Sequence, residues 1–272
     1  MAVKVHWVHA LLGTACVVVV FPMFWMLSTA LKPPSEIFAG TFRLWPTHST
    51  LGNFSTAMTQ VPLLRLFWNS LFVAVAVTAA QAFTSVLAAY ACAILRVPGQ
   101  RLWFGLFVAT MMVPFQVTMI PNYLLMARLD LLNSYTGLIL PQVITGYGIF
   151  MLRQTYKNLP ASLVEAGILD GASSWQILWR IVVPATGTAL VALSVLFFIN
   201  TWNQYLWPLL VASDKYMKTL PVGMQEFVSL EGGTNWGPLM AAATMAIVPA
   251  LLAYVVAQRY ILESFLSAGL KE

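Results

Sequence analysis

Six long stretches of the chain carry no charged residue and are mainly apolar. A helix needs roughly 20 such residues to cross the hydrocarbon core of a bilayer, and each stretch is longer than that. Runs such as residues 70–80 (SLFVAVAVTAA) lack the alternating faces of a membrane-spanning strand. The pattern therefore predicts an all-α, polytopic membrane protein with six transmembrane helices. The charge-free stretches are residues 5–31, 66–95, 102–127, 131–152, 181–213 and 232–258.

The predicted spans belong to a single transmembrane domain that covers residues 1–272. A seventh charge-free run, residues 44–64, is rich in polar residues, so we predict that it is part of a long loop over residues 31–67. Pro114 and Pro121 predict a kink in the third span, because proline removes a hydrogen bond from a helix. The predicted spans lie near residues 9–30, 69–94, 102–126, 136–155, 187–211 and 237–258.

Composition and charge agree with a surface that faces lipid. Only 8% of the residues are charged, whereas a soluble domain carries about 25%. Six spans place both termini on the same side, and the short basic turn 96–101 (RVPGQR) marks that side as cytoplasmic. With this orientation eight basic residues lie inside and six outside, a weak bias in the same direction. The basic residues form no stripe, so nucleic acid is not an expected partner.

Few side chains are arranged to perform chemistry. Cys16 and Cys92 lie inside predicted spans and fit small apolar positions, and the three histidines are scattered along the chain. The sequence contains no Gly-rich phosphate loop with its lysine. We therefore expect no catalytic residue, no metal site and no cofactor. A secondary transporter or channel would need an ionisable relay inside the spans, and the charge-free stretches contain none.

The most polar inner segment, residues 157–185, separates the fourth span from the fifth. Ser162 followed three residues later by Glu165 matches a capping box and predicts a short helix that runs to about Asp170. Gly171 suits the left-handed position that often follows a helix. The segment is therefore predicted to turn sharply at this glycine.

A second helix is predicted to start near Ser173 or Ser174 and to continue until Pro184 disturbs it. The two helices would form a helix–turn–helix against the inner face of the membrane. An amphipathic helix that only anchors the loop at the interface is the alternative interpretation. The side chains predicted to be exposed are Glu165, Asp170, Ile168, Leu169 and Trp175.

This segment resembles the EAA motif of ABC importer permeases, which reads Glu-Ala-Ala, three residues, Gly, nine residues, Ile-x-Leu-Pro. The chain departs from the motif at Gly167, where alanine is expected, and at Val183, where leucine is expected. A glycine there loosens the first helix by up to about 1 kcal/mol. The residues that carry the resemblance are Glu165, Ala166, Gly167, Gly171, Ile181, Val183 and Pro184.

Other segments extend the resemblance along the whole chain to the maltose-type carbohydrate permeases, and within them to the glycerol-3-phosphate and glycerophosphodiester permease branch. The resemblance implies a type I ABC importer permease fold, multi-pass in a bacterial plasma (inner) membrane with both termini cytoplasmic. The segments are residues 131–141 (LLNSYTGLILP), 200–210 (NTWNQYLWPLL), 220–225 (LPVGMQ), 231–240 (EGGTNWGPLM) and 268–272 (AGLKE).

In this family residues 157–185, called here the coupling loop, dock on an ATP-binding subunit and transmit its motion to the transmembrane helices. The resemblance implies a transporter subunit that is not an enzyme, with ATP hydrolysed by a homodimeric partner. A second permease subunit, an extracytoplasmic solute-binding protein and membrane lipid are the other implied partners. The tail, residues 266–272, is expected to reach the ATPase dimer. The residues expected to take part in coupling are Glu165, Ala166, Gly167, Asp170, Gly171 and Pro184.

Several polar side chains inside the spans are candidates for a solute path. Such groups are costly in lipid unless they face a partner or water. Asn200 and Gln204 are four residues apart, so they are predicted to share a helical face. Hydrogen bonding between helices is the alternative role for each of them. The candidates are Gln116, Asn200, Trp202, Asn203, Gln204 and Tyr205, with Gln81 and Asn69 as weaker ones.

The resemblance implies import of a small polar solute, namely glycerol-3-phosphate, a glycerophosphodiester or a sugar. A di- or oligosaccharide permease, or a transporter outside the ABC class, is the alternative. The outer loop over residues 214–236 is expected to face the solute-binding protein, although each of its residues is equally compatible with a solvated loop. The candidate contacts are Glu226, Glu231, Asn235 and Trp236.

Overall fold

The fold comes from a computed structural model that describes residues 2–39, 43–95, 97–229 and 233–269, with side chains over 7–39, 43–95, 97–228 and 233–259. Within these ranges, one short hairpin pairs β1 (Val228–Ser229) antiparallel with β2 (Gly233–Thr234), and the other regular elements are helices. The predicted all-α class is therefore confirmed. The helices are α1 (Ala2–Ala30), α2 (Pro34–Ile37), α3 (Gly52–Gln60), α4 (Leu63–Ala93), α5 (Gln100–Met111), α6 (Phe115–Arg128), α7 (Tyr135–Ile139), η1 (Leu140–Gln142), α8 (Gly146–Lys157), α9 (Ala161–Leu169), α10 (Ser174–Ile177), η2 (Leu178–Val182), α11 (Val183–Ala185), α12 (Gly187–Trp202), α13 (Leu206–Val211), α14 (Leu220–Gly223), η3 (Met224–Phe227) and α15 (Trp236–Gly269).

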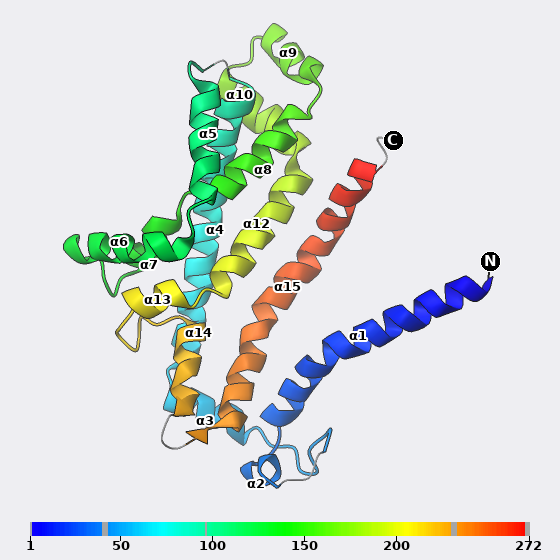
Figure 1. Cartoon of the computed structure of the whole chain (residues 1–272), viewed down its shortest axis with the longest axis vertical. Helices are drawn as coiled ribbons and strands as arrows, with labels where there is room; N and C mark the ends of the chain where they lie inside the picture. The colour runs from blue at the N-terminus through cyan, green and yellow to red at the C-terminus, as the bar shows by residue number, and fades with distance from the viewer. Residues whose placement is uncertain (1, 40–42, 96, 230–232, 270–272) are drawn as a thin grey trace. The chain divides into compact units, whose positions relative to one another are not determined.

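The chain forms two compact units, and Figure 1 shows the course of their helices. The first unit consists of Met1–Phe67 and Thr219–Pro249, and the second consists of Trp68–Lys218 and Ala250–Glu272. The first unit contains the elements between the first two spans and those that precede the last span. The second unit contains the coupling loop.

Three helices are long and apolar enough to cross a membrane alone, and three bent helix pairs meet the same test together. The single helices are Trp7–Ala30, Leu63–Ala93 and Trp236–Arg259. The pairs are Gln100–Met111 with Phe115–Arg128, bent by 97°, Tyr135–Gln142 with Gly146–Lys157, bent by 46°, and Ser174–Ala185 with Gly187–Trp202, bent by 81°. When each bent pair counts as one span, the described residues give up to six spans, which is the number that the sequence predicts, although the pair that forms the fifth span begins at Ser174 and not near residue 187.

The third span is broken where proline predicted a kink. Helix α5 ends at Met111 and α6 begins at Phe115, with Pro114 at the N-cap position. Proline has no N–H to donate and its ring clashes with the carbonyl four residues earlier, so it kinks or breaks a helix. Pro121 behaves differently, because α6 continues through it.

The outer connection over residues 31–67 is more helical than the sequence suggested. Helices α2 and α3 lie inside it, and α4 begins at Leu63, several residues before the predicted span. Asn53 holds α3 against the end of α1, because its side-chain amide donates to the carbonyl oxygens of Ala30 at 2.8 Å and Lys32 at 2.7 Å. The loop prediction for this region is therefore wrong in part, since polar residues there serve to bind backbone groups.

Glu36 of α2 binds the backbone of two residues further along this connection. Its carboxylate accepts hydrogen bonds from the backbone N–H groups of Thr47 at 3.0 Å and His48 at 3.3 Å. The Thr47 N–H holds the pKa of the Glu36 carboxyl below its usual value, and His48 N–H and Arg43 act in the same direction. These bonds tie α2 to the chain that follows it.

Arg153 joins three helices of the second unit. Its side chain is 9% exposed, its Nε donates to the Cys92 carbonyl oxygen at 2.9 Å, and its guanidinium carbon lies 3.6 Å from the centroid of the Phe104 ring. The last carbonyls of a helix have no partner within the helix, so Arg153 of α8 satisfies one at the end of α4. The sequence analysis counted Arg153 among the eight basic residues of the inner side, and the structure shows that its side chain is buried.

Replacing Arg153 with methionine should lower the thermal unfolding midpoint of the protein in detergent, because a buried carbonyl loses its donor at a cost of about 1–3 kcal/mol. Arg153→Lys should also be less stable than the natural protein, since an ammonium group cannot stack flat on Phe104. Lys157→Met, on the same helix but exposed, is the matched control. Equal midpoints for Arg153→Met and Lys157→Met would contradict this role.

Candidate functional site: the coupling loop

The coupling loop folds as the predicted helix–turn–helix. Helix α9 ends at Leu169, Asp170 follows as its C-cap, and Gly171 adopts a φ of 74°. This left-handed conformation favours glycine, so the predicted turn is confirmed. Figure 1 shows α9 and α10 at the end of α12 that lies away from α13. The loop therefore occupies one end of the second unit.

The capping box lies on the second helix of the loop and not on the first. Helix α9 follows Pro160 without a side-chain cap, so the predicted box between Ser162 and Glu165 is wrong. The box forms instead at α10, where Gln176 Oε1 accepts from the Ser173 N–H at 2.8 Å and Ser173 Oγ accepts from the Gln176 N–H at 3.3 Å. Both segments match the pattern, but α9 starts at Ala161 with Pro160 as its N-cap, two residues too early for Ser162 to act as the cap.

One face of the loop combines acidic and large apolar side chains, and all of them are exposed. Ile168, Leu169 and Trp175 are 60%, 87% and 58% exposed, and the Glu165 and Asp170 side chains are exposed beside them. Water solvates such apolar groups poorly, so a contiguous patch of them indicates a binding partner or a membrane surface. The predicted exposure of these five residues is confirmed.

The other face of the loop is packed tightly, and Gly167 is the point of closest approach. A Cβ atom at this position would lie 2.6 Å from Ile181 Cδ1 and 3.4 Å from Ile177 Cγ1. Gly167 is buried, so α9 rests directly on the helix that follows it. Glycine at position 167, where the EAA motif has alanine, therefore allows α9 to approach Ile181 closely. This contact opposes the loss of helix stability that glycine was expected to cause.

A π-helix, η2 (Leu178–Val182), connects α10 to α11 and was not predicted from the sequence. Pro184 follows it, and a proline there cannot donate to the carbonyl of Arg180 as an α-helix would require. Leu178 and Val182 of η2 are buried in a cluster with side chains of α4, α8 and α12. The coupling loop is therefore attached to three transmembrane helices through a buried segment.

The candidate solute-path residues lie at a helix break. Helix α12 ends at Trp202, Asn203 is its C-cap, and Gln204 and Tyr205 precede α13. Asn200 and Gln204 therefore do not share a helical face, and that prediction is wrong because the helix stops between them. Trp202 is buried and stacks on Phe198.

This break lies beside the break in the third span. Helix α13 packs against α6, and the Trp207 and Phe115 rings meet edge to face with centroids 6.4 Å apart. Gln116, next to Phe115, is exposed. Gln204 Oε1 and Trp207 Nε1 are buried atoms without a hydrogen-bond partner in the described structure. Non-helical backbone at membrane depth is tolerated where it is buried in protein or lines a water-filled cavity.

The two weaker path candidates serve to hold helices together. The Asn69 amide donates to the carbonyl oxygens of Tyr216 at 2.8 Å and Lys218 at 3.0 Å, and it accepts from the Tyr135 hydroxyl at 2.6 Å. The Gln81 amide donates to the Gln142 carbonyl oxygen at 2.7 Å. Both side chains therefore have the inter-helix role that was the alternative.

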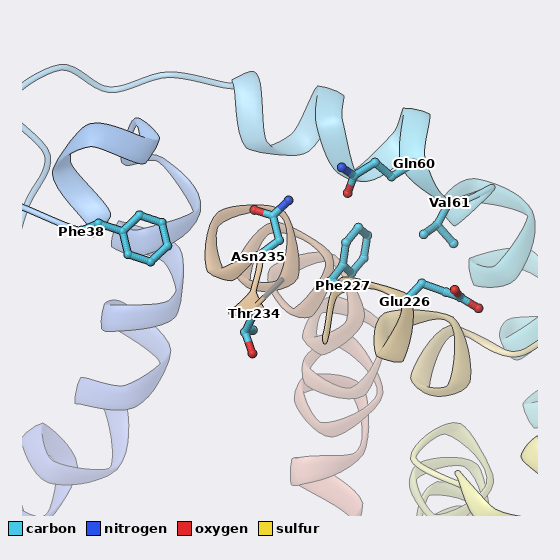
Figure 2. A pocket seen from close by; sticks show the side chains of 8 residues that line it. Phe38, Gln60, Val61, Glu226, Phe227, Thr234 and Asn235 are labelled. Atoms are coloured by element: carbon cyan, nitrogen blue, oxygen red, sulfur yellow. The ribbon is translucent and has the colours of Figure 1, made fainter. Parts of the chain in front are cut away.

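A separate pocket lies among the outer elements of the first unit and has a volume of about 480 Å³. Figure 2 shows side chains from α2, α3 and the hairpin region converging on it. Two predicted binding-protein contacts, Glu226 and Asn235, line the pocket, while Trp236 is exposed beside it and Glu231 lies outside the described residues. The lining residues are Phe38, Gln60, Val61, Glu226, Phe227, Gly233, Thr234 and Asn235.

Sequence reasoning missed Phe38 and Gln60, because no spacing rule links them to a hairpin so far along the chain. The tail expected to reach the ATPase dimer lies outside the described side chains, since these end at residue 259 and residues 270–272 are not described at all. Within the described ranges, no group of three His, Cys, Asp or Glu side chains is placed to hold a metal ion.

A family model described as "Binding-protein-dependent transport system inner membrane component" matches residues 82–265, which include the coupling loop. The chain belongs to this family. It is therefore a multi-pass inner-membrane permease subunit, as the EAA motif indicated, and by family not an enzyme. This permease carries the motif at the position where its helix–turn–helix is exposed.

Curated relatives match nearly the whole permease. The sn-glycerol-3-phosphate transport system permease protein UgpE of Yersinia pestis bv. Antiqua (strain Antiqua) is 34% identical over 264 residues, which cover 93% of this chain and 92% of that protein. The arabinooligosaccharides transport system permease protein AraQ of Halalkalibacterium halodurans is 31% identical over 257 residues, with the same coverage. The permease is thus similar to transport subunits whose names differ in solute.

A solved structure confirms the fold of the permease. A chain in the crystal structure of a bacterial ABC transporter involved in the import of the acidic polysaccharide alginate superposes with a TM-score of 0.85. The match covers 95% of this chain and 96% of that chain at 22% identity. The predicted ABC importer permease fold is confirmed.

Proposed function

We propose that the coupling loop of this permease docks on a homodimeric ATP-binding subunit and transmits its motion to the transmembrane helices. The observation that carries the proposal is the exposed acidic and apolar face of α9 and α10 on a helix pair whose opposite face is buried. Movement at that face reaches three transmembrane helices through η2. A rigid, anchored segment of this kind suits the transmission of force from a partner.

Each coupling residue has a specific role in this proposal. Glu165 pairs with a basic residue of the ATP-binding subunit, and Ala166 allows its close approach. Asp170 and Gly171 form the turn that enters the cleft, and Pro184 ends the segment. Gly167 keeps α9 in contact with Ile181.

The coupling loop and both termini lie on the cytoplasmic side in this proposal, and the outer pocket lies on the opposite side. Six spans and the basic turn 96–101 support this orientation. A solute-binding protein then delivers its ligand to the outer loops, and a second permease subunit completes the transmembrane path. Gln116, Asn200, Trp202, Asn203, Gln204 and Tyr205 contribute to that path beside the two helix breaks.

The proposed solute is sn-glycerol-3-phosphate or a related glycerophosphodiester, supported by the names of relatives that are 34% identical. An oligosaccharide is the second candidate, supported by the arabinooligosaccharide relative. No lysine or arginine lies near Gln116 or Asn200 in the sequence. An anionic solute would therefore obtain its positive charge from the partner permease or from helix N-termini.

Affinity purification of the tagged permease from its own cells tests this function. An ATP-binding subunit and a second permease should purify with it, and the complex in proteoliposomes should take up solute only with ATP and the solute-binding protein. Uptake of glycerol phosphates compared with oligosaccharides then identifies the solute class. Purification without an ATP-binding subunit, or uptake that does not depend on ATP, would overturn the proposal.

A further inference from the structure

We infer that a second pocket, between the end of α4 and the start of α5, binds one acyl chain of an anionic phospholipid. Arg101 and the Trp103 indole N–H are its contacts with the lipid headgroup. The pocket has a volume of about 160 Å³ and lies within the second unit. It shares no lining residue with the coupling loop or the candidate solute path, so a lipid bound there is a partner beyond the proposed function.

The pocket lies where two spans reach the membrane surface. Helices α4 and α5 each belong to a candidate span, and the short turn over residues 94–99 joins them. The lining of the pocket begins at the turn, with Val97 and Gln100, and extends along α5 to Phe107. At 1.5 Å per residue, the distance from Gln100 to Phe107 is about 10 Å of helix. A chain that enters at headgroup level therefore runs into the hydrocarbon layer beside both helices.

The interior of the pocket suits hydrocarbon. Small side chains of α4, namely Ala88, Ala91 and Cys92, form one wall, and Trp103 and Phe107 of α5 form the other. An apolar cavity of about 150 Å³ stays free of water, so a pocket of this size and lining is more stable when an apolar group fills it.

The surroundings of the pocket mouth point to lipid as the source of that apolar group. On α5, Leu102 and Leu106 are 66% and 49% exposed on either side of Trp103. In a transmembrane span, an exposed apolar face of this kind is solvated by acyl chains. The pocket is therefore reached from a surface on which phospholipids already lie.

Two donors at the turn select the headgroup. Trp103 is 54% exposed, and its Nε1 would lie 3.7 Å from a Cβ atom at Gly99, so the N–H end of the ring lies beside the turn. Arg101 is exposed in the same first turn of α5, and neither side chain makes a hydrogen bond or ion pair in the described structure. A guanidinium group binds phosphate oxygens strongly, and indole rings favour the headgroup level of a bilayer.

The sequence around the turn favours an anionic lipid over a zwitterionic one. No aspartate or glutamate occurs between Glu36 and Asp130, so neither α4 nor α5 supplies a carboxylate that would compete for Arg101. A basic residue near an anionic membrane surface contributes about 1 kcal/mol of attraction, which corresponds to about fivefold in affinity. Phosphatidylglycerol carries a net negative charge and phosphatidylcholine carries none, so these two lipids are the probes.

The walls of the pocket are fixed before a lipid binds. The Gln100 amide donates to the carbonyl oxygens of Ala91 at 3.1 Å and Leu95 at 3.0 Å, which ties the start of α5 to the end of α4. Arg153 of α8 donates to the Cys92 carbonyl oxygen at 2.9 Å and stacks on Phe104, so the pocket is also held from behind. A preformed site loses less conformational entropy on binding than a flexible one.

Photo-labelling tests the occupant. Phosphatidylglycerol with a photoreactive group on its acyl chain, in nanodiscs that hold the full-length permease and any subunits that purify with it, should label residues 88–107. Ala91→Phe fills the pocket and should lower this labelling about fivefold or more, whereas Ala79→Phe, exposed on α4 but not lining the pocket, should not change it. If Ala91→Phe lowers the yield of folded protein, Val97→Trp closes the pocket from an exposed position in the turn. Equal labelling in the filled and unaltered proteins would overturn the inference.

Lipid-binding measurements test the charge. In native mass spectrometry of the delipidated protein, phosphatidylglycerol should bind about fivefold more tightly than phosphatidylcholine with the same chains, and Arg101→Gln should remove this preference. Lys157→Gln, at an exposed basic residue of α8, is the matched control and should keep the preference. Equal affinity of the unaltered protein for both lipids would overturn the headgroup assignment. A photoreactive amino acid at Val97 that crosslinks to another subunit instead of lipid would assign the pocket to that subunit and overturn the lipid site.

Discussion

Glu165→Arg should reduce ATP-driven uptake by about 100-fold or more while the protein still inserts into the membrane. The Glu165 side chain is exposed on α9 and makes no hydrogen bond or ion pair in the described structure, so its replacement breaks no such bond within the chain. A positive charge there would face a basic residue of the ATP-binding subunit, and like charges in contact cost several kcal/mol. Uptake in proteoliposomes, normalised to the amount of inserted permease, measures the effect.

The controls separate the charge from the site. Glu165→Gln removes the attraction without adding repulsion, so it should lose less activity than Glu165→Arg. Asn158→Arg adds the same charge in the exposed turn just before α9 and should transport normally. Normal uptake by Glu165→Arg would show that this face does not dock. Recovery of uptake by an acidic substitution in the ATP-binding subunit would identify the paired residue.

The sequence predicted most of the coupling loop because its signals are local. Gly171 predicts a left-handed turn, and the acidic and apolar residues around it predict an exposed face. The capping box was misplaced because two segments carry the same pattern, and only the backbone around Pro160 decides between them. The π-helix η2 was missed, since the burial of Leu178 and Val182 depends on helices far away in the sequence.

The spans were predictable from hydrophobicity, but their breaks were predictable only in part. Pro114 predicted the first break because it lies at the N-cap position of α6, whereas the break after Trp202 lies six residues before its proline, Pro208, in the first turn of α13. The polar residues before α4 predicted a loop, but the Asn53 amide instead holds helix α3 in place through its hydrogen bonds to backbone carbonyls. Local composition reports whether a residue faces lipid. It does not report which distant backbone group a polar side chain will bind.

Gly167→Leu should reduce uptake by about tenfold or more, because it separates α9 from the helix that anchors it. A Cβ atom alone would lie 2.6 Å from Ile181 Cδ1, so a leucine side chain has no space without a shift of α9. Overpacking of a tight contact costs about 1–3 kcal/mol, and the shift would also move Glu165 away from its docking position. Transport assays and protease sensitivity of the loop should change together.

Two further variants show whether the contact with Ile181 is the cause. Gly167→Ala combined with Ile181→Val removes Cδ1 and should transport as well as the natural protein, since alanine favours the helix by about 1 kcal/mol over glycine. Gly105→Leu, at a helical glycine with nothing within 4 Å of its Cβ position, is the matched control and should transport normally. Full activity of Gly167→Leu would mean that α9 need not rest on η2 for force to pass. Loss in the Gly167→Ala and Ile181→Val double variant would instead assign Gly167 a direct contact with the ATP-binding subunit.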